Sequence, residues 1–315
     1  MSNLQSDSSF FIDNHFHGGG GISNDSVADL YMIDKSRGLK ALETVLAPHK
    51  KSGTAYHTLS LVTAEKSTLI RRTAALSEIA KGRDDILGIH LEACFLSPLH
   101  KGAHDEKLLC NPDISFLKEL VSAGGGEIAQ ITIAPELDGG LKAIEYIRGE
   151  NIVPSIGHTD ADYKIAFQAL EAGACNFTHL FNTMRQIQHR APGPIMAARD
   201  WYKAGNSLTV EIINDGFHIN PIIVKLAYDL FSNHQTGETA VALVTDAMEA
   251  AGMNDGNYKI GNLPVIVKAG LAKIAGSDTI AGSTLTLGQA RENAIKLGID
   301  ERFIKNSLAK KILID

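Results

Sequence analysis

Cysteine is scarce in this sequence of 315 residues. The three cysteines, Cys94, Cys110 and Cys175, are scattered and form no Cys-x-x-Cys motif. An odd set of this kind argues against a disulfide framework and against a thiolate zinc site. We therefore expect a protein of a reducing, cytoplasmic setting.

Long apolar runs and an excess of basic residues are missing as well. No run approaches the ~18 consecutive apolar residues of a membrane span, and the start, MSNLQSDSSFF, has no signal-peptide pattern. The formal net charge of −6 means that the sequence lacks the excess of basic residues typical of nucleic-acid-binding proteins. We expect neither a membrane nor a nucleic-acid partner. A small anionic substrate is compatible, because a few local groups can bind it.

Short β-rich runs alternate with helical patterns along the chain. Apolar residues make up 44% of the sequence, which is enough for a sizeable core. Several runs, such as IAQITIA and VALV, are nearly continuous apolar segments, as in parallel strands covered on both faces. The runs predicted as strands are Ser9–Asp13, Thr54–Val62, Ile86–His90, Ile128–Ala134, Ile152–Ile156, Ala174–Phe177, Ser207–Ile213 and Val241–Val244.

Helical patterns fill the intervals between these runs. Asp160–Ala172 has an acidic first turn and a glycine directly after it, and Ile222–Phe231 follows an Asn-Pro pair. Eight strands with crossover helices match the size and order of a (β/α)8 TIM-type barrel. A doubly wound open sheet is the alternative, but no Gly-x-Gly-x-x-Gly motif follows the first run.

No internal repeat or linker divides the sequence. We expect one domain over residues 1–315, with the barrel in residues 9–250 and an extension in residues 251–315. The extension contains two possible short strands, Tyr258–Ile260 and Val265–Lys268. Helical stretches over residues 284–297 and 301–313 are predicted to end the chain.

Histidines and carboxylates follow the predicted strands at the points where the strands end. Barrel enzymes build their active sites at the C-terminal ends of the strands, so these side chains are expected to converge. The candidate metal ligands of this set are His15, His17, Glu92, His158, His179 and Asp246.

Each of these residues also has an ordinary structural explanation. A His-x-His pair such as His15 and His17 places both rings on one side of a strand, yet packed histidines do the same. Asp246 could be a helix N-cap. As a set they favour a metal centre, because two imidazoles and a carboxylate are usual ligands of catalytic zinc. Asp246 then becomes a candidate acid/base for the hydrolytic water.

Three further polar residues are expected at the mouth of the barrel. His104, Arg190 and His218 lie in the loops after the third, sixth and seventh predicted strands. Loop residues of this kind are usually only solvated. Beside a metal site they are candidates to hold substrate, and arginine suits a phosphate or a carboxylate.

Seven motifs in order give a resemblance to a known family. They are HFHGGGG, GIHLEACFLSP with KGAH, SIGHTDADY, THLFNTM with HRAPG, EIINDGFHINP, VTDAMEAAG and IAGSTLTL. Together they resemble the N-acetylglucosamine-6-phosphate deacetylases of the amidohydrolase superfamily. The resemblance runs from about Phe11 to the end of the chain.

The resemblance implies a role for each matched residue. Glu92, His158 and His179 match the ligands of the main divalent metal, and His15 and His17 match a pair that holds a second metal in some members. Asp246 and His104 match catalytic groups. The matched substrate-binding positions are Ala103, Asn182, Thr183, Arg190, His218, Ile280, Ala281 and Gly282.

The implied activity is hydrolysis of the acetamide of N-acetylglucosamine 6-phosphate to acetate and glucosamine 6-phosphate. One or two divalent ions are implied, with zinc first and iron, manganese or cobalt as alternatives. The family also implies a homodimer in which the position of Arg190 reaches the neighbouring subunit's site. The galactosamine epimer, another amidohydrolase reaction such as cyclic amide hydrolysis or deamination, and a truncated chain that only binds are the alternatives.

Two departures from the family pattern stand out. Ala93 and Cys94 replace the usual Gly-Pro after the glutamate, which could shift the loop that leads to His104. The family also carries a small β-sandwich formed by segments before and after the barrel. Most of it is expected to be missing here, with a remnant hairpin over Tyr258–Ile274.

Overall fold

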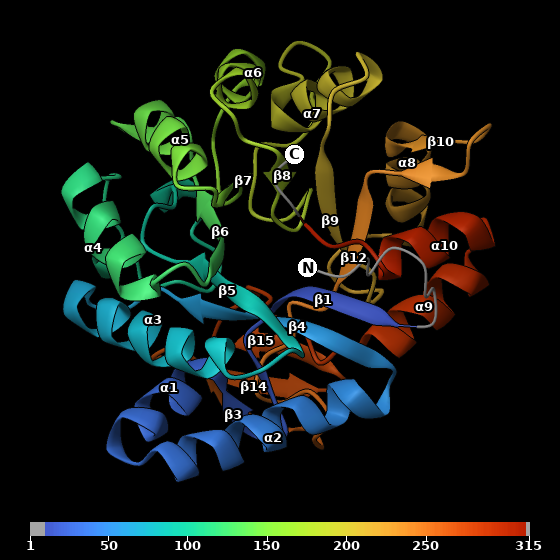
Figure 1. The fold of residues 1–315 in the computed structure, drawn as a ribbon. Coiled ribbons are helices and arrows are strands. Elements are labelled where there is room, and N and C mark those ends of the chain that lie inside the picture. The colour runs from blue at the N-terminus through green and yellow to red at the C-terminus, as the bar shows by residue number, and fades with distance from the viewer. Residues whose placement is uncertain (1–9, 313–315) are drawn as a thin grey trace.

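The computed structural model describes residues 10–312, and its centre is an eight-stranded parallel sheet that curves into a barrel (Figure 1). The strands are neighbours in the order in which they occur along the chain. This arrangement confirms the predicted (β/α)8 barrel. The barrel strands are β1 Phe11–Phe16, β4 Thr54–Val62, β5 Ile86–Glu92, β6 Ile128–Ile133, β7 Val153–Ile156, β8 Asn176–Phe177, β9 Thr209–Ile213 and β12 Val241–Val244.

Each predicted run coincides with one of these strands, and the first differs most in its bounds. It was expected at Ser9–Asp13, but the strand extends to Phe16, and Ser9 lies outside the described residues. Strand β1 continues because its parallel pairing with β4 runs as far as Phe16 opposite Leu59. The histidine of β1 is therefore part of the strand itself.

Helices surround the barrel and cover the outer faces of its strands (Figure 1). Helix α6 begins at Tyr163, three residues later than expected, because Asp162 acts as its N-cap and accepts a hydrogen bond from the Ile165 amide at 2.8 Å. The helices are α1 Asn24–Ile33, α2 Lys35–Lys51, α3 Lys66–Lys81, α4 Ile114–Gly124, α5 Gly140–Gly149, α6 Tyr163–Glu171, α7 Gly193–Lys203, α8 Pro221–Phe231, α9 Leu287–Lys296 and α10 Glu301–Leu308, with 3₁₀ turns at Pro98–His100 and Glu106–Leu108. None of the helices within residues 10–312 has the length and apolar character to cross a membrane.

The first and last barrel strands, β1 and β12, meet through a few specific hydrogen bonds. The Asp246 amide donates to the His15 carbonyl at 2.8 Å. The Thr245 hydroxyl donates to the buried Asp13 carboxylate at 2.6 Å. Burial raises the pKa of Asp13 to about 7, although the hydrogen bonds from Thr245 oppose that shift. The closure of the barrel therefore positions Asp246 beside His15.

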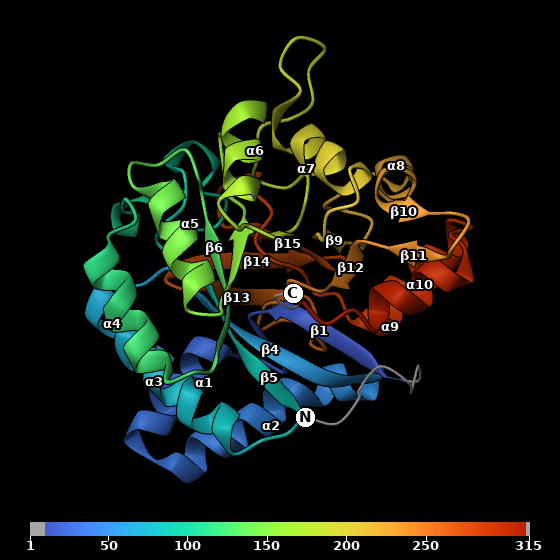
Figure 2. The ribbon, with the colours of Figure 1, turned by 45° about the horizontal axis from the view of Figure 1, so that its top comes forward.

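A small antiparallel sheet follows the barrel (Figure 2). The expected remnant hairpin is a three-stranded sheet, because a third strand pairs with the second. Its apolar face packs on Val62, at the end of β4, and on Met248, which follows β12. The sheet therefore lies at the C-terminal ends of the barrel strands. Its strands are β13 Gly256–Ile260, β14 Leu263–Lys268 and β15 Leu271–Ile274, and the remaining short strands are β2 Gly18–Gly19, β3 Ile22–Ser23, β10 Ser232–Asn233 and β11 Glu238–Thr239.

Two buried histidines pack against Phe16, the last residue of β1. His57 lies on β4, and neither of its ring nitrogens has a hydrogen-bond partner among the described residues. Nε2 of His49 donates to the Gly18 carbonyl at 3.0 Å, since a carbonyl can only accept, so Nε2 carries the proton. Burial lowers the pKa of His57 to about 3 and that of His49 to about 4.

The substitution His57→Leu is expected to make the free energy of unfolding less sensitive to acid. Relative to the unsubstituted chain, the variant should therefore be more stable at pH 5 than it is at pH 8. The pKa of His57 is lowered on folding, so the unfolded chain binds more protons below pH 6.5 and stability falls as the pH decreases. At about 1.4 kcal/mol per unit, His57 alone removes roughly 2 kcal/mol between pH 8 and pH 5. Denaturant unfolding with a chelator at both pH values measures the effect.

The exposed His189→Leu variant is the control, because water hydrates that ring in both states. If the stability difference between His57→Leu and the unsubstituted chain is the same at pH 8 and pH 5, burial of an unprotonated His57 is refuted.

Candidate metal centre

The ends of five barrel strands bring the predicted metal-binding residues together. His15 lies within β1, and His17 is the residue directly after that strand. Glu92 is the last residue of β5. All six candidates are buried, with at most 8% of each residue exposed. The remaining three, His158, His179 and Asp246, each lie two residues beyond their strands, β7, β8 and β12.

One oxygen of Glu92 faces His158 and His179. The Oε1 atom lies 3.2 Å from Nε2 of His158 and 2.8 Å from Nε2 of His179. The two imidazole nitrogens are 3.1 Å apart. These three atoms form a compact triangle of one carboxylate oxygen and two nitrogens.

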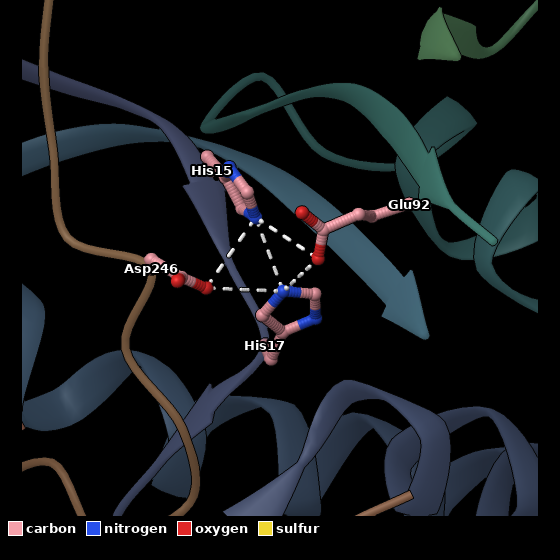
Figure 3. Close-up of side chains that lie close together, drawn as sticks. All are labelled: His15, His17, Glu92 and Asp246. Atoms are coloured by element: carbon pink, nitrogen blue, oxygen red, sulfur yellow. Dashed lines mark hydrogen bonds and ion pairs between the residues drawn. The ribbon is translucent and has the colours of Figure 1, made fainter. Parts of the chain in front are cut away.

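The other oxygen of Glu92 faces the histidines of the first strand (Figure 3). Its Oε2 atom is 3.0 Å from Nε2 of His17 and 3.5 Å from Nε2 of His15. Oδ1 of Asp246 approaches the same nitrogens, at 3.2 Å and 3.4 Å respectively. The four ligand atoms lie within 4.8 Å of one another. Glu92 thus belongs to two adjoining sets of donor atoms.

The charges in this cluster favour a bound cation. Burial opposes protonation of His15 and His17, yet the carboxylates of Glu92 and Asp246 outweigh it and raise the pKa of His17 to about 9 and that of His15 well above its usual value. Burial would raise the pKa of Asp246, but the adjacent histidines lower it to about 2. Two ionised carboxylates among nitrogen donors fit a divalent metal ion, which supplies the same positive charge.

Hydrogen bonds behind the rings set which nitrogen faces the cluster. Nδ1 of His158 lies 2.8 Å from the His100 carbonyl, which can only accept, so Nδ1 carries the proton. Nε2 is then left with a lone pair directed at Glu92. Burial lowers the pKa of His158 to about 4, which favours the neutral ring that a metal ligand requires.

A buried carboxylate that the sequence analysis overlooked orients His15. Glu211 is fully buried in the middle of β9, and its Oε2 accepts from Nδ1 of His15 at 2.9 Å and from the His179 amide at 3.2 Å. Its Oε1 accepts from the side-chain amides of Gln130 and Asn176, each at 2.8 Å. A carboxylate that accepts a hydrogen bond from the other ring nitrogen of a metal-ligating histidine fixes the tautomer of that ring. The sequence signal that could have identified Glu211 was its position as a single glutamate within the apolar run TVEII.

Three strand-end residues have left-handed backbone conformations. The φ angles are 47° at His158, 30° at His179 and 47° at Asp246. Non-glycine residues rarely adopt such angles, and they concentrate where a side chain must be held in a functional position. Here the turn directs each side chain from the end of its strand into the cluster.

His104 is adjacent to the cluster and borders an open cavity. Its Nδ1 lies 2.8 Å from the Thr63 hydroxyl, and its Nε2 lies 3.7 Å from Oε2 of Glu92. A cavity of about 720 Å³ adjoins the residue on the side of the small sheet. The lining residues are Lys101, Gly102, His104, Asp105, Glu106, Lys107, Leu263, Ile274, Ser277 and Thr279.

The structure places most of the predicted substrate-binding residues around these strand ends. The side-chain amide of Asn182 donates to the His179 carbonyl at 3.1 Å, and Thr183 follows it in the same loop. His218 pairs with Asp215 at 2.7 Å. Burial opposes the charge of His218, but Asp215 and, more weakly, Asp246 raise its pKa.

The segment Ile280–Gly282 is tied to the catalytic candidate Asp246. The Ser283 amide donates to the Asp246 carbonyl at 2.8 Å. The Ala281 amide donates to the carbonyl of Ala272, a residue of β15, at 3.1 Å. Ala281 and Ala103 both belong to the apolar cluster under the small sheet.

Arg190 is the candidate that the structure does not bring to the cluster. It is exposed in the segment between β8 and α7, which extends above α7 in Figure 2. Within residues 10–312 its side chain makes no hydrogen bond or ion pair with the strand-end residues.

Known proteins with similar sequences are deacetylases of phosphorylated amino sugars. No protein-family model matches the chain. The chain is 32% identical to N-acetylglucosamine-6-phosphate deacetylase of Bacillus subtilis over 88% of its own length and 67% of that protein. It is 31% identical to N-acetylgalactosamine-6-phosphate deacetylase of Escherichia coli O157:H7, over 91% and 71% of the two lengths.

A solved structure shows the same fold at higher identity. The N-acetyl-D-glucosamine-6-phosphate deacetylase of Mycobacterium smegmatis superposes with a TM-score of 0.85 and 38% identity, over 96% of this chain and 74% of that one. An Asp-to-Ala variant of the same enzyme, solved in complex with N-acetyl-D-glucosamine-6-phosphate, superposes with a TM-score of 0.84.

The substitution Glu211→Gln is expected to weaken metal binding while leaving the barrel folded. A glutamine side chain offers one oxygen and one NH₂ group in place of the two oxygens of Glu211. The NH₂ group must face one of the two pairs of donors that these oxygens now accept from, so the His15 ring loses its fixed orientation. Loss of the group that bonds to the other ring nitrogen of a metal-ligating histidine typically costs about 10- to 100-fold in metal affinity. Competition with a chromogenic chelator measures that affinity, and circular dichroism checks the fold.

The exposed Glu119→Gln variant is the matched control. An unchanged metal affinity in a folded Glu211→Gln protein would show that Glu211 does not support the centre.

Proposed function

The chain belongs to the N-acetylglucosamine-6-phosphate deacetylase family, and we propose that it hydrolyses the acetamide of N-acetylglucosamine 6-phosphate to acetate and glucosamine 6-phosphate. The observation that carries the proposal is the Glu92 centre, in which both carboxylate oxygens contact imidazole nitrogens and Asp246 adjoins one of the two sets. Hydrolysis of an unactivated amide needs an acid/base group and a stabilised oxyanion in one place.

The donor atoms suit one or two divalent ions. Glu92, His158 and His179 would hold the first ion, and His15 and His17 would hold a second. Zinc is preferred for this nitrogen and oxygen donor set, with iron, manganese and cobalt as the other candidates. A bound ion supplies a Lewis acid, which polarises the amide carbonyl and increases the acidity of water.

Asp246 serves as the base and then as the acid. The neighbouring histidines hold the pKa of Asp246 near 2, so its carboxylate is ionised and can accept a proton at neutral pH. It takes the proton from the attacking water as the new C–O bond forms. It returns that proton to the nitrogen as the C–N bond breaks, and the second proton of the water passes from the acetic acid to the amine, so the products are acetate and the protonated amine.

His104 stabilises the oxyanion of the tetrahedral intermediate. Its ring is buried, and its Nε2 lies within the same group of side chains as Glu92 and His158. If the Thr63 hydroxyl donates to Nδ1, Nε2 carries the proton and can donate to the oxyanion.

The remaining predicted residues bind the sugar phosphate. His218 carries a positive charge more readily than an ordinary histidine because Asp215 raises its pKa. Together with Arg190 it is assigned to the phosphate, whereas Asn182, Thr183 and Ala103 are assigned to the sugar and the acetamide. The segment Ile280–Gly282 closes over the substrate.

The proposal includes a homodimer and a cytoplasmic setting. The exposed position of Arg190 suits a contact with the neighbouring subunit's site better than one within its own chain. The galactosamine epimer is the second candidate substrate, since the Escherichia coli relative is named for it. The two substrates differ at one hydroxyl group, and acetate release from each distinguishes them.

The substitution Asp246→Asn is expected to lower kcat by about 10²- to 10⁴-fold, the usual contribution of a general acid/base. Asparagine keeps the size of the side chain but can neither take up nor return the proton. Acetate release from N-acetylglucosamine 6-phosphate, measured together with metal content, tests the assignment. The exposed Asp84→Asn variant is the control.

Substantial turnover by an Asp246→Asn protein that retains its metal would contradict the role of Asp246. Failure of the unsubstituted, metal-loaded chain to release acetate from either epimer would overturn the proposed reaction itself.

The substitution His218→Asn is expected to raise KM for the phosphorylated substrate about tenfold or more, because a hydrogen bond to a charged group contributes roughly 1.5–3 kcal/mol. Arg190→Ala should act in the same direction. Unphosphorylated N-acetylglucosamine is the control substrate, since neither residue should affect it. An equal loss with both substrates would show that the residues do not bind the phosphate.

A further inference from the structure

Two of the three cysteines come together at the ends of the loop that carries His104. Cys94 lies two residues after β5, and Cys110 lies just before α4. The Cys110 amide donates a hydrogen bond to the Cys94 carbonyl at 2.8 Å. The segment between them, residues 95–109, contains both 3₁₀ turns and His104. The two cysteines therefore form the neck of this loop.

The two thiols differ in burial. Cys94 is 1% exposed, packs in the main core and has a left-handed φ of 50°. Its amide donates to the Thr63 hydroxyl at 3.0 Å, and the same hydroxyl contacts His104. Cys110 is only partly buried at the edge of that core. An oxidant can therefore reach Cys110 before it reaches Cys94.

We propose that Cys94 and Cys110 are a peroxide-sensitive thiol pair that closes reversibly to a disulfide at the neck of the His104 loop. Cys110 is the attacking residue and Cys94 is the resolving residue. The pair adds an oxidative modification site beside a hydrolytic centre that has no redox step of its own.

The surroundings of Cys110 favour its thiolate. A hydrogen bond with the Cys94 thiol lowers the pKa of Cys110 to about 7, the Lys66 ammonium adds to this effect, and partial burial opposes it. The ammonium also lies 4.8 Å from the centre of the Phe116 ring, so it stays near the start of α4. Only the thiolate attacks a peroxide, and at neutral pH a large share of Cys110 is in that form.

The chemistry balances with a hydroperoxide as the oxidant. The Cys110 thiolate attacks one oxygen of hydrogen peroxide, the O–O bond breaks, and the products are a sulfenic acid and hydroxide, which takes up a proton to become water. The Cys94 sulfur then attacks the sulfenic sulfur, the S–O bond breaks, and the second water leaves with the thiol proton. Two thiols and one peroxide thus give one disulfide and two waters.

The backbone already suits the cross-link. The bond from the Cys110 amide to the Cys94 carbonyl, 2.8 Å long, puts the two backbone segments in direct contact. A disulfide needs Cα atoms about 4.4–6.8 Å apart, a range that segments in direct backbone contact can reach. The oxidised loop can therefore keep the path that it has in the reduced protein.

The experiment treats the metal-loaded, full-length protein with a small excess of hydrogen peroxide and counts thiols. The protein has three cysteines, and we expect two thiols to disappear and to return with dithiothreitol. Intact mass should fall by two hydrogen atoms, and peptide mapping should find Cys94 linked to Cys110. Thiol loss should slow by about tenfold for each pH unit below 7, as thiolate is lost.

Three variants separate the roles of the cysteines. Cys175→Ser is the matched control and should lose two thiols at the unsubstituted rate. Cys110→Ser should abolish the fast reaction. Cys94→Ser should react at Cys110 but stop at a sulfenic acid that dimedone traps.

Three outcomes would overturn the proposal. They are a disulfide that joins two chains, a linkage that involves Cys175, and a Cys110 sulfenic acid that persists in the unsubstituted protein. Each is read from mass and peptide mapping, so the result does not depend on whether the chain deacetylates an amino sugar.

Discussion

The shared carboxylate of Glu92 is the interaction around which the rest of the site is arranged. One oxygen contacts His158 and His179, and the other contacts His17 and, more distantly, His15. A carboxylate buried in this way is costly unless cations or donors surround it. The four other strands that supply the cluster must therefore end at the same level as β5. His158, His179 and Asp246 adopt left-handed backbone angles to reach the cluster. The barrel supplies this convergence because all its parallel strands end at one face.

A second buried carboxylate supports the first from inside the barrel. Glu211 accepts two side-chain amides, one backbone amide and the ring of His15, so its four acceptor positions are used. The same interior contains a chain of hydroxyls, in which Thr178 contacts Thr132 at 2.8 Å. Satisfied polar networks of this kind hold side chains in one arrangement. The Glu92 cluster therefore rests on an ordered polar layer, which limits how far its histidines can turn.

Much of this was accessible from the sequence, for identifiable physical reasons. Continuous apolar runs marked the barrel strands, and alternation along β1 placed His15 and His17 on one side, as their 3.1 Å contact confirms. Glu211 was overlooked because it lies in mid-strand, where no end-of-strand rule applies. The third strand of the small sheet, Leu271–Ile274, is too short to have a clear period. The contact of Cys94 with Cys110 depends on how a loop returns to its start, which spacing alone does not specify.

The hydrogen bonds that close the barrel join residues far apart in the chain. Asp13 and Thr245 are separated by 232 positions, yet their contact sets Asp246 beside His15. On a ribosome that adds about 5–20 residues per second, roughly 12 to 46 s pass between the synthesis of the two partners. During that interval the nascent chain carries His15 and His17 without Asp246. The strand-end cluster can therefore be completed only when the last barrel strand has emerged, and assembly of the centre is a late event in synthesis.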